Sequence, residues 1–286
     1  MLKSLLVVAT TLAAVPHLAA AQPSGSDRTA AARAPANLQM WRLDCGEIRV
    51  TNLDVFSDTY SYVGREKTLT DSCYLIRNGN RYLLWDTGLP GALAGQPEGG
   101  QEPFRISLRT RIRDQLRRMG VRPEQISFVG ISHHHFDHTG QAADFPGATL
   151  LIGDEDWEAI RTDPRQAALF RPWVEGGARR EAIARDHDVF GDGSVVMLDM
   201  PGHTAGHHGL LVRLPQTGPV LLTGDLFHFQ ENMNNRGVPG FNVDRADTLA
   251  SFDRFREIAR SLGATIIIQH EPADIAKLPA FPEAAR

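Results

Sequence analysis

The chain has 286 residues, with 30 basic and 34 acidic side chains and a formal net charge of −4. This slightly acidic balance gives no electrostatic reason to expect nucleic acid as a partner. The length suits one large domain or two small ones. Beyond the first residues no apolar stretch is long enough to cross a bilayer, so we expect no membrane span once that segment is removed.

Residues 1–21 have the features of a secretory signal peptide. Lys3 precedes a short apolar run, and small residues around Ala20 provide a cleavage site before Gln22. We therefore expect a periplasmic or secreted protein. Residues 22–39 are rich in Ala, Ser, Pro and Arg without any period and are predicted to be a flexible leader, which leaves 40–286 as the folded domain.

Cys45 and Cys73 are the only two cysteines. An oxidising environment outside the cytoplasm would allow them to pair. Closing the loop between them would stabilise the fold by about 3 kcal/mol in the chain-entropy description. Two buried thiols are the alternative, because the sequence does not supply the geometry that a disulfide requires.

From Leu43 onward, short apolar or β-branched runs alternate with turns. Residues 73–84, CYLIRNGNRYLL, predict a β-hairpin that turns at Asn78-Gly79-Asn80. Two segments have helical spacing. The first is 105–120, in which one face carries Leu108, Ile112, Leu116 and Met119 and the arginines form a solvated face. The second is 246–263. Many strands interleaved with a few helices predict a layered α/β domain.

Residues 132–140, SHHHFDHTG, directly follow the apolar run QISFVGI. His133 and His135 are two residues apart, so they project to the same side of an extended segment. Asp137 and His138 come after a turn and can face a neighbouring position. The motif therefore offers a pair of nitrogens to one metal ion and an oxygen with a nitrogen to another. A histidine run that binds metal loosely is the alternative interpretation.

Three isolated polar residues follow other apolar runs in the same way. His203 comes after SVVMLDM, Asp225 after PVLLTG and His270 after TIIIQ. This pattern is expected when separate strands deliver ligands to one edge of a sandwich. It favours a built metal centre over a loose histidine run.

The series HxHxDH, GH, GD and QH, with WDTG at residues 85–88, resembles the metallo-β-lactamase superfamily. The resemblance implies an α/β fold, a four-layer αββα sandwich in a single domain, with two metal ions. It implies that one ion is bound by His133, His135 and His203. The other ion would be bound by Asp137, His138 and His270, and Asp225 would bridge the two.

Imidazole and carboxylate ligands without thiolate suit Zn²⁺, with Fe, Mn or Co as alternatives. Two ions that share a hydroxide would catalyse hydrolysis at neutral pH. Asp137 could also pass a proton to the leaving group. Asp86, Thr204 and His207 are candidates for orienting the ligands, whereas we expect His134, His187 and His208 to be neighbours without a role.

Several segments resemble more narrowly the N-acyl homoserine lactonases, which open bacterial quorum-sensing lactones; these are LDCGEIRV, TLTDSCYLI, LLWDTGLPG, SHHHFDHTG, MPGHTAGHHGL and LLTGDLF. Phe136 matches that group's usual residue. The resemblance implies a small-molecule lactone substrate and hydroxide attack on its carbonyl. The group usually has a tyrosine three residues after the bridging aspartate, where this chain has His228. We predict that His228, with Asp137, is catalytic, since a histidine could donate the same hydrogen bond or bind metal.

Apolar residues on predicted loops could form a groove for an acyl chain; they are Phe56, Tyr60, Phe136, Phe227, Phe229 and Met233. Ordinary packing is the alternative for all six. A homodimer is compatible with the sequence.

Other activities of the superfamily remain as alternatives. A β-lactamase would lack the carboxylate at Asp225, and a thioesterase of the glyoxalase II type would need a helical domain after His270, where only sixteen residues follow. An organophosphate hydrolase is a further hydrolytic alternative. A persulfide dioxygenase with a single iron would leave the second histidine pair unused. The signal peptide and acidic balance disfavour RNA processing.

Overall fold

The computed structural model describes residues 37–286. The predicted signal peptide and most of the predicted leader lie outside these residues. Leu38 is already buried and the first strand begins at Gln39, so the folded part starts slightly before the predicted residue 40. Within the described range, no helix combines the length and the apolar character that crossing a bilayer requires.

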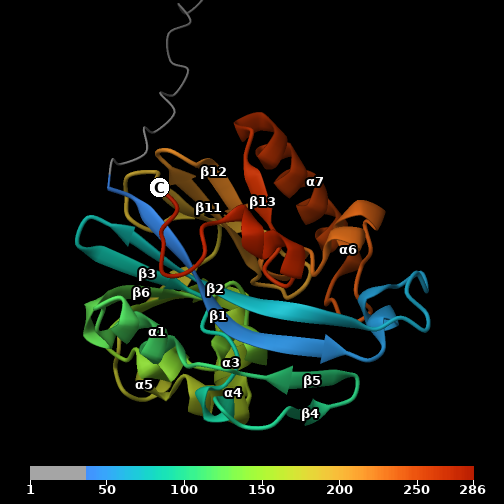
Figure 1. The fold of residues 1–286 in the computed structure, drawn as a ribbon, viewed down its shortest axis with the longest axis horizontal. Coiled ribbons are helices and arrows are strands. Elements are labelled where there is room, and N and C mark those ends of the chain that lie inside the picture. Colours follow the sequence, from blue (N-terminus) through green and yellow to red (C-terminus); the bar gives the residue numbers. More distant parts are fainter. Residues whose placement is uncertain (1–36) are drawn as a thin grey trace, which may run out of the picture. The chain divides into compact units, whose positions relative to one another are not determined.

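Two mixed β-sheets form the centre of the fold (Figure 1). The first sheet has the strand order β4-β5-β1-β2-β3-β6-β7-β8, and its strands are β1 (Gln39–Val50), β2 (Lys67–Asn78), β3 (Arg81–Trp85), β4 (Gly99–Gln101), β5 (Phe104–Ser107), β6 (Ile126–Gly130), β7 (Thr149–Gly153) and β8 (Arg180–Ile183). The second has the order β13-β12-β11-β10-β9, with β9 (His187–Asp188), β10 (Val195–Asp199), β11 (His208–Leu214), β12 (Gly218–Leu222) and β13 (Thr265–Ile267).

Helices cover the outer face of each sheet, which confirms the predicted α/β sandwich (Figure 1). On the first sheet lie α1 (Ile112–Arg118), α3 (Asp154–Thr162), α4 (Pro164–Leu169) and α5 (Arg171–Val174), and on the second lie α6 (Gln230–Asn235) and α7 (Arg245–Leu262). The short helix α2 (Phe136–Thr139) follows β6. Single 3₁₀ turns occur at Leu53–Phe56, Gly91–Leu93, Pro123–Gln125, Ala142–Asp144, Gly224–Leu226 and Pro272–Lys277.

Helix α7 agrees with the predicted segment 246–263 to within one residue at each end. The Asp244 side chain accepts a hydrogen bond from the Asp247 backbone N–H at 2.8 Å, and this satisfies one free donor of the first turn. Gly263 ends the helix with a φ of 60°, which a residue without a side chain adopts at little cost. Phe252 and Phe255 are fully buried and join an apolar cluster with Leu221 of β12. This burial fastens α7 to the second sheet.

The predicted helix over 105–120 is wrong in its first half. Residues 104–107 form β5, whose Ile106 pairs with Ile48 of β1. The helix begins only at Ile112. The segment could pair with the free edge of β1 through backbone hydrogen bonds. This pairing stabilised a strand more than the apolar spacing of the segment stabilised a helix. The hairpin of β2 and β3 and its turn at Gly79 are as predicted.

Cys45 and Cys73 form a disulfide between β1 and β2, with Cα atoms 5.8 Å apart. The loop that follows β3 packs directly on this disulfide. A Cβ added at Gly88 would lie 2.5 Å from the Cβ of Cys45, and Gly88 has a φ of 62°. Glycine at this position therefore allows the WDTG loop to sit against the disulfide, and the same loop hydrogen-bonds to α2, since the Thr87 backbone N–H donates to the carbonyl of His138 at 2.7 Å.

Candidate metal centre

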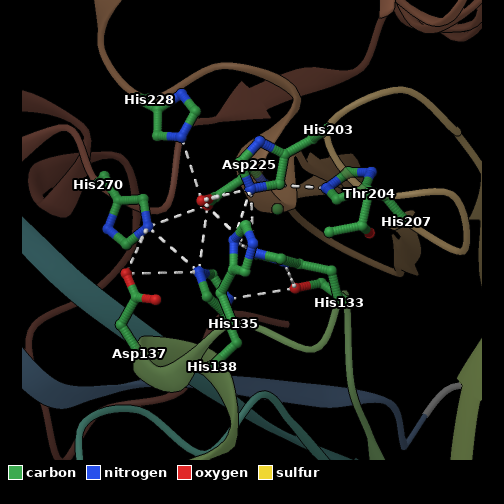
Figure 2. A network of polar contacts seen from close by, with 12 residues as sticks. His133, His135, Asp137, His138, His203, Thr204, His207, Asp225, His228 and His270 are labelled. Atoms are coloured by element: carbon green, nitrogen blue, oxygen red, sulfur yellow. Dashed lines mark hydrogen bonds and ion pairs between the residues drawn. The ribbon is translucent and has the colours of Figure 1, made fainter. Parts of the chain in front are cut away.

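The seven predicted ligands all lie just beyond the ends of strands and converge at one edge of the two sheets (Figure 2). His133 and His135 follow β6, and Asp137 and His138 lie in α2. The other three follow β10, β12 and β13, and are His203, Asp225 and His270 respectively. Each side chain therefore reaches the centre from backbone that a sheet holds in place.

The first group is a triangle of imidazole nitrogens. His133 Nε2 lies 3.0 Å from His135 Nδ1, and His203 Nε2 lies 3.1 Å from the first and 3.0 Å from the second. Ligands of one tetrahedral zinc ion, each about 2.0–2.1 Å from it, are separated by similar distances. Three ring nitrogens that face one another in this way fit a single shared cation.

The second group contains His138, His270 and Asp137. The Nε2 atoms of the two histidines are 3.2 Å apart, and Asp137 Oδ2 lies 3.9 and 3.8 Å from them. This group supplies two nitrogens and one carboxylate oxygen, a donor set that suits Zn²⁺.

The Asp225 carboxylate divides its two oxygens between the groups. Oδ1 lies 2.9 Å from His270 Nε2 and 3.1 Å from His138 Nε2. Oδ2 lies 3.3 Å from His203 Nε2 and 3.5 Å from His133 Nε2. A single carboxylate therefore spans both positions, which is the geometry needed to bridge two ions.

Asp86 orients the second group from behind. Its Oδ2 accepts a hydrogen bond from His138 Nδ1 at 2.9 Å and another from Gln269 Nε2 at 2.9 Å. Its Oδ1 accepts from the backbone N–H of Ser132 at 2.7 Å. Asp86 has a φ of 58°, a region that non-glycine residues seldom occupy, and these contacts hold it there. Because His138 donates through Nδ1, its Nε2 lone pair is free to face the centre.

The outer nitrogens of two other ligand rings are held in the same way. His270 Nδ1 donates to the backbone carbonyl of Thr70 at 2.7 Å, and His203 Nδ1 donates to Asn242 Oδ1 at 2.9 Å. Both contacts leave Nε2 as the inward acceptor. Asn242 and Thr70 lie far from the ligand motifs in the sequence, which gave no signal for them.

Of the predicted orienting residues His207 and Thr204, only His207 contacts a metal ligand directly. His207 Nδ1 donates to the carbonyl of Met200 at 2.9 Å, and its Nε2 accepts the backbone N–H of Asp225 at 3.0 Å. Burial lowers the pKa of His207 to about 4, so the ring is neutral and can accept. The Thr204 hydroxyl donates to Asp156 at 2.8 Å, so its contact is with another side chain and not with a ligand.

The electrostatics of the two groups differ. Burial lowers the pKa of His133 and of His203 well below the usual value, so these rings are neutral and can offer lone pairs. Burial also acts to lower the pKa of His270, but the Asp225 carboxylate outweighs it and raises that pKa to about 9. Without a metal, His270 of the second group thus binds a proton, because the buried negative charge beside it stabilises a positive one.

His228 lies across the centre from α2 (Figure 2). Its Nε2 lies 3.1 Å from Asp225 Oδ2, although neither ring nitrogen makes a well-oriented hydrogen bond within the described residues. The ring is parallel to that of His270, with centroids 6.0 Å apart, and it packs on Phe56 at 4.5 Å. A buried imidazole that contacts Asp225 thus borders the centre.

A cavity of about 240 Å³ opens beside the ligands. Its polar side is formed by His135, Asp137, Asp225, His228 and His270, and its apolar side by Ile48, Phe56, Leu69, Phe104, Phe136 and Phe241. Only Phe56 and Phe136 belong to the six predicted groove residues. The wall therefore comes mainly from β1, β2, β5 and the loop before α7.

The other four predicted groove residues do not line this cavity. Phe227 and Phe229 flank His228 in extended backbone, so when His228 faces the cavity its neighbours face away. Phe227 packs on Phe252 of α7 with ring centroids 4.5 Å apart, and Phe229 packs on Tyr62 at 5.2 Å. Met233 packs in the apolar cluster under α7, and Tyr60 is 81% exposed and does not line the cavity.

His134, which we expected to have no role, makes a partly buried contact: its backbone N–H donates a hydrogen bond to Asp156 Oδ2 at 3.1 Å. Asp156 is a residue that the sequence gave no reason to select. His208 is buried and its Nδ1 contacts the carbonyl of Gly206 at 2.8 Å, whereas His187 lies on β9. Neither is among the residues of the two ligand groups.

Comparison with known proteins places this centre in a family. The model of the metallo-beta-lactamase superfamily matches residues 69–270. The chain belongs to the metallo-β-lactamase superfamily, and its two groups of histidine and aspartate side chains could each hold a metal ion.

Among curated relatives, the chain is related to N-acyl homoserine lactonases. It is 33% identical to N-acyl homoserine lactonase AttM of Azorhizobium caulinodans over 165 residues, which are 55% of this chain and 63% of that protein, so the match spans less than two thirds of AttM. It is 29% identical to an N-acyl homoserine lactonase of a Bacillus species over 218 residues, 74% of this chain and 85% of that protein.

Solved structures share the fold. An N-acyl homoserine lactone hydrolase with N-hexanoyl-L-homoserine at its catalytic metal centre superposes with a TM-score of 0.74 at 24% identity, covering 86% of this chain and 98% of that one. The dizinc lactonase AidC superposes with a TM-score of 0.65 at 16% identity, covering 87% and 90%.

Proposed function

We propose that this protein is a dinuclear zinc hydrolase that opens the ring of N-acyl homoserine lactones. The observation that carries the proposal is the Asp225 carboxylate, whose oxygens face two ligand groups at the floor of a cavity with an apolar wall. The relationship to N-acyl homoserine lactonases supports the substrate class. Fe, Mn and Co remain alternative metals for the same donors.

In this proposal one ion would be held by His133, His135 and His203 and the other by Asp137, His138 and His270, and Asp225 would contact both. When bound, two such ions lower the pKa of water towards neutrality and polarise a carbonyl oxygen. The water oxygen forms a bond to the lactone carbonyl carbon, and the ring carbon–oxygen bond breaks. The product is an N-acyl homoserine.

Two side chains handle protons and orientation. Asp137 belongs to the second group and lines the cavity, so its carboxylate can carry the water proton to the departing ring oxygen. His228 also lines the cavity, with no well-oriented hydrogen bond at either ring nitrogen within the described residues, and can donate a hydrogen bond to the substrate carbonyl. This is the role that the related group's tyrosine implies.

The apolar wall gives the acyl chain its place. Phe136 and Phe241 stand at the open side of the cavity, where they are 44% and 41% exposed, and Ile48, Leu69 and Phe104 line its inner part. Burying a methylene group against such a wall contributes about 0.8 kcal/mol. The wall therefore favours a lactone that carries an acyl chain over the bare ring.

We also propose export to the periplasm or beyond the cell. The disulfide between Cys45 and Cys73 supports this location, because such bonds persist mainly in oxidising compartments.

A hydrolysis screen with a pH indicator tests the proposal. The substrates are acyl homoserine lactones of several chain lengths, simple γ- and δ-lactones, and a β-lactam. We expect acyl homoserine lactones to be the best substrates. Turnover of the β-lactam without opening of any acyl homoserine lactone would contradict the substrate class.

Metal analysis of the purified protein separates this reaction from the redox alternative. Two ions per chain are expected, since His138 and His270 form a second ligand group with Asp137. One iron per chain and no zinc would favour a dioxygenase instead.

A further inference from the structure

Asp156 is a buried carboxylate at the start of α3, outside the ligand motifs. It is only 1% exposed, and both of its oxygens accept hydrogen bonds. Oδ2 accepts from the His134 backbone N–H at 3.1 Å and from Thr204 Oγ1 at 2.8 Å. Oδ1 accepts from the Gly206 backbone N–H at 3.0 Å and lies 3.2 Å from His134 Nδ1. The carboxylate thus joins two separate loops.

These two loops carry the three histidines of the first ligand group. His134 stands between His133 and His135, and Thr204 directly follows His203. Asp156 therefore contacts a chain neighbour of every imidazole in the nitrogen triangle. Within the described part of the chain, its hydrogen bonds reach no residue of the second group.

The packing around Asp156 is close enough to fix these loops. A Cβ added at Gly206 would lie 2.7 Å from the Asp156 backbone nitrogen and 3.1 Å from its Cβ, so the loop can approach only because position 206 is glycine. Burial acts to raise the pKa of Asp156, but hydrogen bonds from His134, Thr204 and Gly206 outweigh it and lower that pKa. The side chain is thus ionised and can accept from all of its donors.

We propose that Asp156 is a positioning residue that sets the affinity of the first ligand group for its ion. The carboxylate fixes where the loops after β6 and β10 stand relative to each other, and so fixes the size of the nitrogen triangle. Metal ligands depend on such outer contacts for their orientation. The inference rests on the proposed metal centre but not on the choice of a lactone as substrate.

Titration of the metal-free full-length protein with Co²⁺ tests this proposal, with the visible spectrum as the readout. Two reference variants identify the sites, since His135→Ala damages only the first group and His270→Ala only the second. We expect Asp156→Asn to weaken one ion by about tenfold or more. The ion that remains tightly bound should give the spectrum of His135→Ala.

Asp188→Asn is the matched control, because Asp188 also accepts two backbone N–H groups, from Gly191 at 3.0 Å and Gly193 at 2.6 Å, but at a turn beside β9. It should leave both affinities unchanged. Thr204→Val removes one donor to Asp156 and keeps the side-chain shape, so it should weaken the same ion by about two- to tenfold even if Asp156→Asn does not fold.

Equal weakening of both ions, or unchanged affinity for the first, in Asp156→Asn or Thr204→Val would overturn the proposal. Neither result depends on lactone turnover. If the protein did not open lactones, this inference about Asp156 would still hold. If Asp156 did not affect metal affinity, the proposed lactone substrate would be unaffected.

Discussion

The ligand groups and the apolar wall of the cavity are built on different physical principles. The inward nitrogens of several ligand rings are fixed by hydrogen bonds on the opposite side of the ring, such as those of His138 with Asp86 and His270 with Thr70. The wall is held by contacts between apolar side chains, and Phe136 and Phe241 are partly exposed. Hydrogen bonds are directional and apolar contacts are not. We infer that the chemistry of the site is fixed while the fit to substrate is adaptable.

The comparison predicts that damage to the ligand groups costs far more activity than damage to the wall. Asp225→Asn should have the largest effect, because it weakens the one side chain that faces both groups. We expect a loss well beyond about 100-fold, the upper range for an outer contact of a metal ligand. Lactone turnover measured together with metal content is the check. Near wild-type turnover with two ions bound would show the site assignment to be wrong.

His228 stands where the ligand groups and the wall meet. His228→Phe keeps the ring's packing on Phe56 but removes both nitrogens, and we expect about a 100-fold lower kcat, as for loss of a hydrogen-bond donor to the reacting carbonyl. Metal content should not change. His228→Tyr restores a donor and should recover part of the rate. If His228→Phe instead released an ion, His228 would be a metal ligand rather than a substrate contact.

Asp86→Ala tests the outer support of the second group. Without this acceptor, His138 and Gln269 lose a partner and the His138 ring is free to turn. We expect about 10- to 100-fold weaker binding of one ion or an equal loss of activity. Calorimetric titration of the metal-free protein measures it. Unchanged affinity for both ions would mean that packing alone orients the ring.

Phe241→Ala should have the smallest effect, and one that depends on the substrate. For long acyl chains we expect KM to rise about fourfold for each methylene group that loses its contact, with kcat unchanged. Tyr60→Ala is the matched control, because Tyr60 is aromatic and 81% exposed but does not line the cavity. An equal rise in KM for short and long chains would argue against an acyl-chain wall.

The sequence predicted the meeting of the ligands well because most of them lie a few residues after the end of a strand. Strand ends at one edge of a sandwich are close in space whatever the details of the loops, so His203, Asp225 and His270 could be placed together from their position alone. Outer contacts such as Asn242 and Asp156 were not found. Asn242 lies in a loop without a motif. Asp156 follows β7, but it is one of three successive acidic residues in the first turn of α3, where acidic side chains are common, so nothing distinguished it from the other two.

The wall was predicted poorly for a related reason. Ile48, Leu69 and Phe104 meet only because β1 pairs with β2 and β5 in one particular register, and the sequence does not state that register. The same unpredicted pairing turned residues 104–107 into a strand. Phe227 and Phe229 were selected as apolar residues on a predicted loop, but alternation along extended backbone turns them away from the cavity.

The most direct test of the central claim follows lactone opening as metal is returned to the metal-free protein. The substrate is an N-acyl homoserine lactone, and bound Zn²⁺ per chain is measured in the same samples. Our account predicts that turnover is absent without metal, reaches its full rate only at two ions per chain, and is not restored in Asp225→Asn. A full rate at one ion per chain, or no lactone turnover at two, would contradict it.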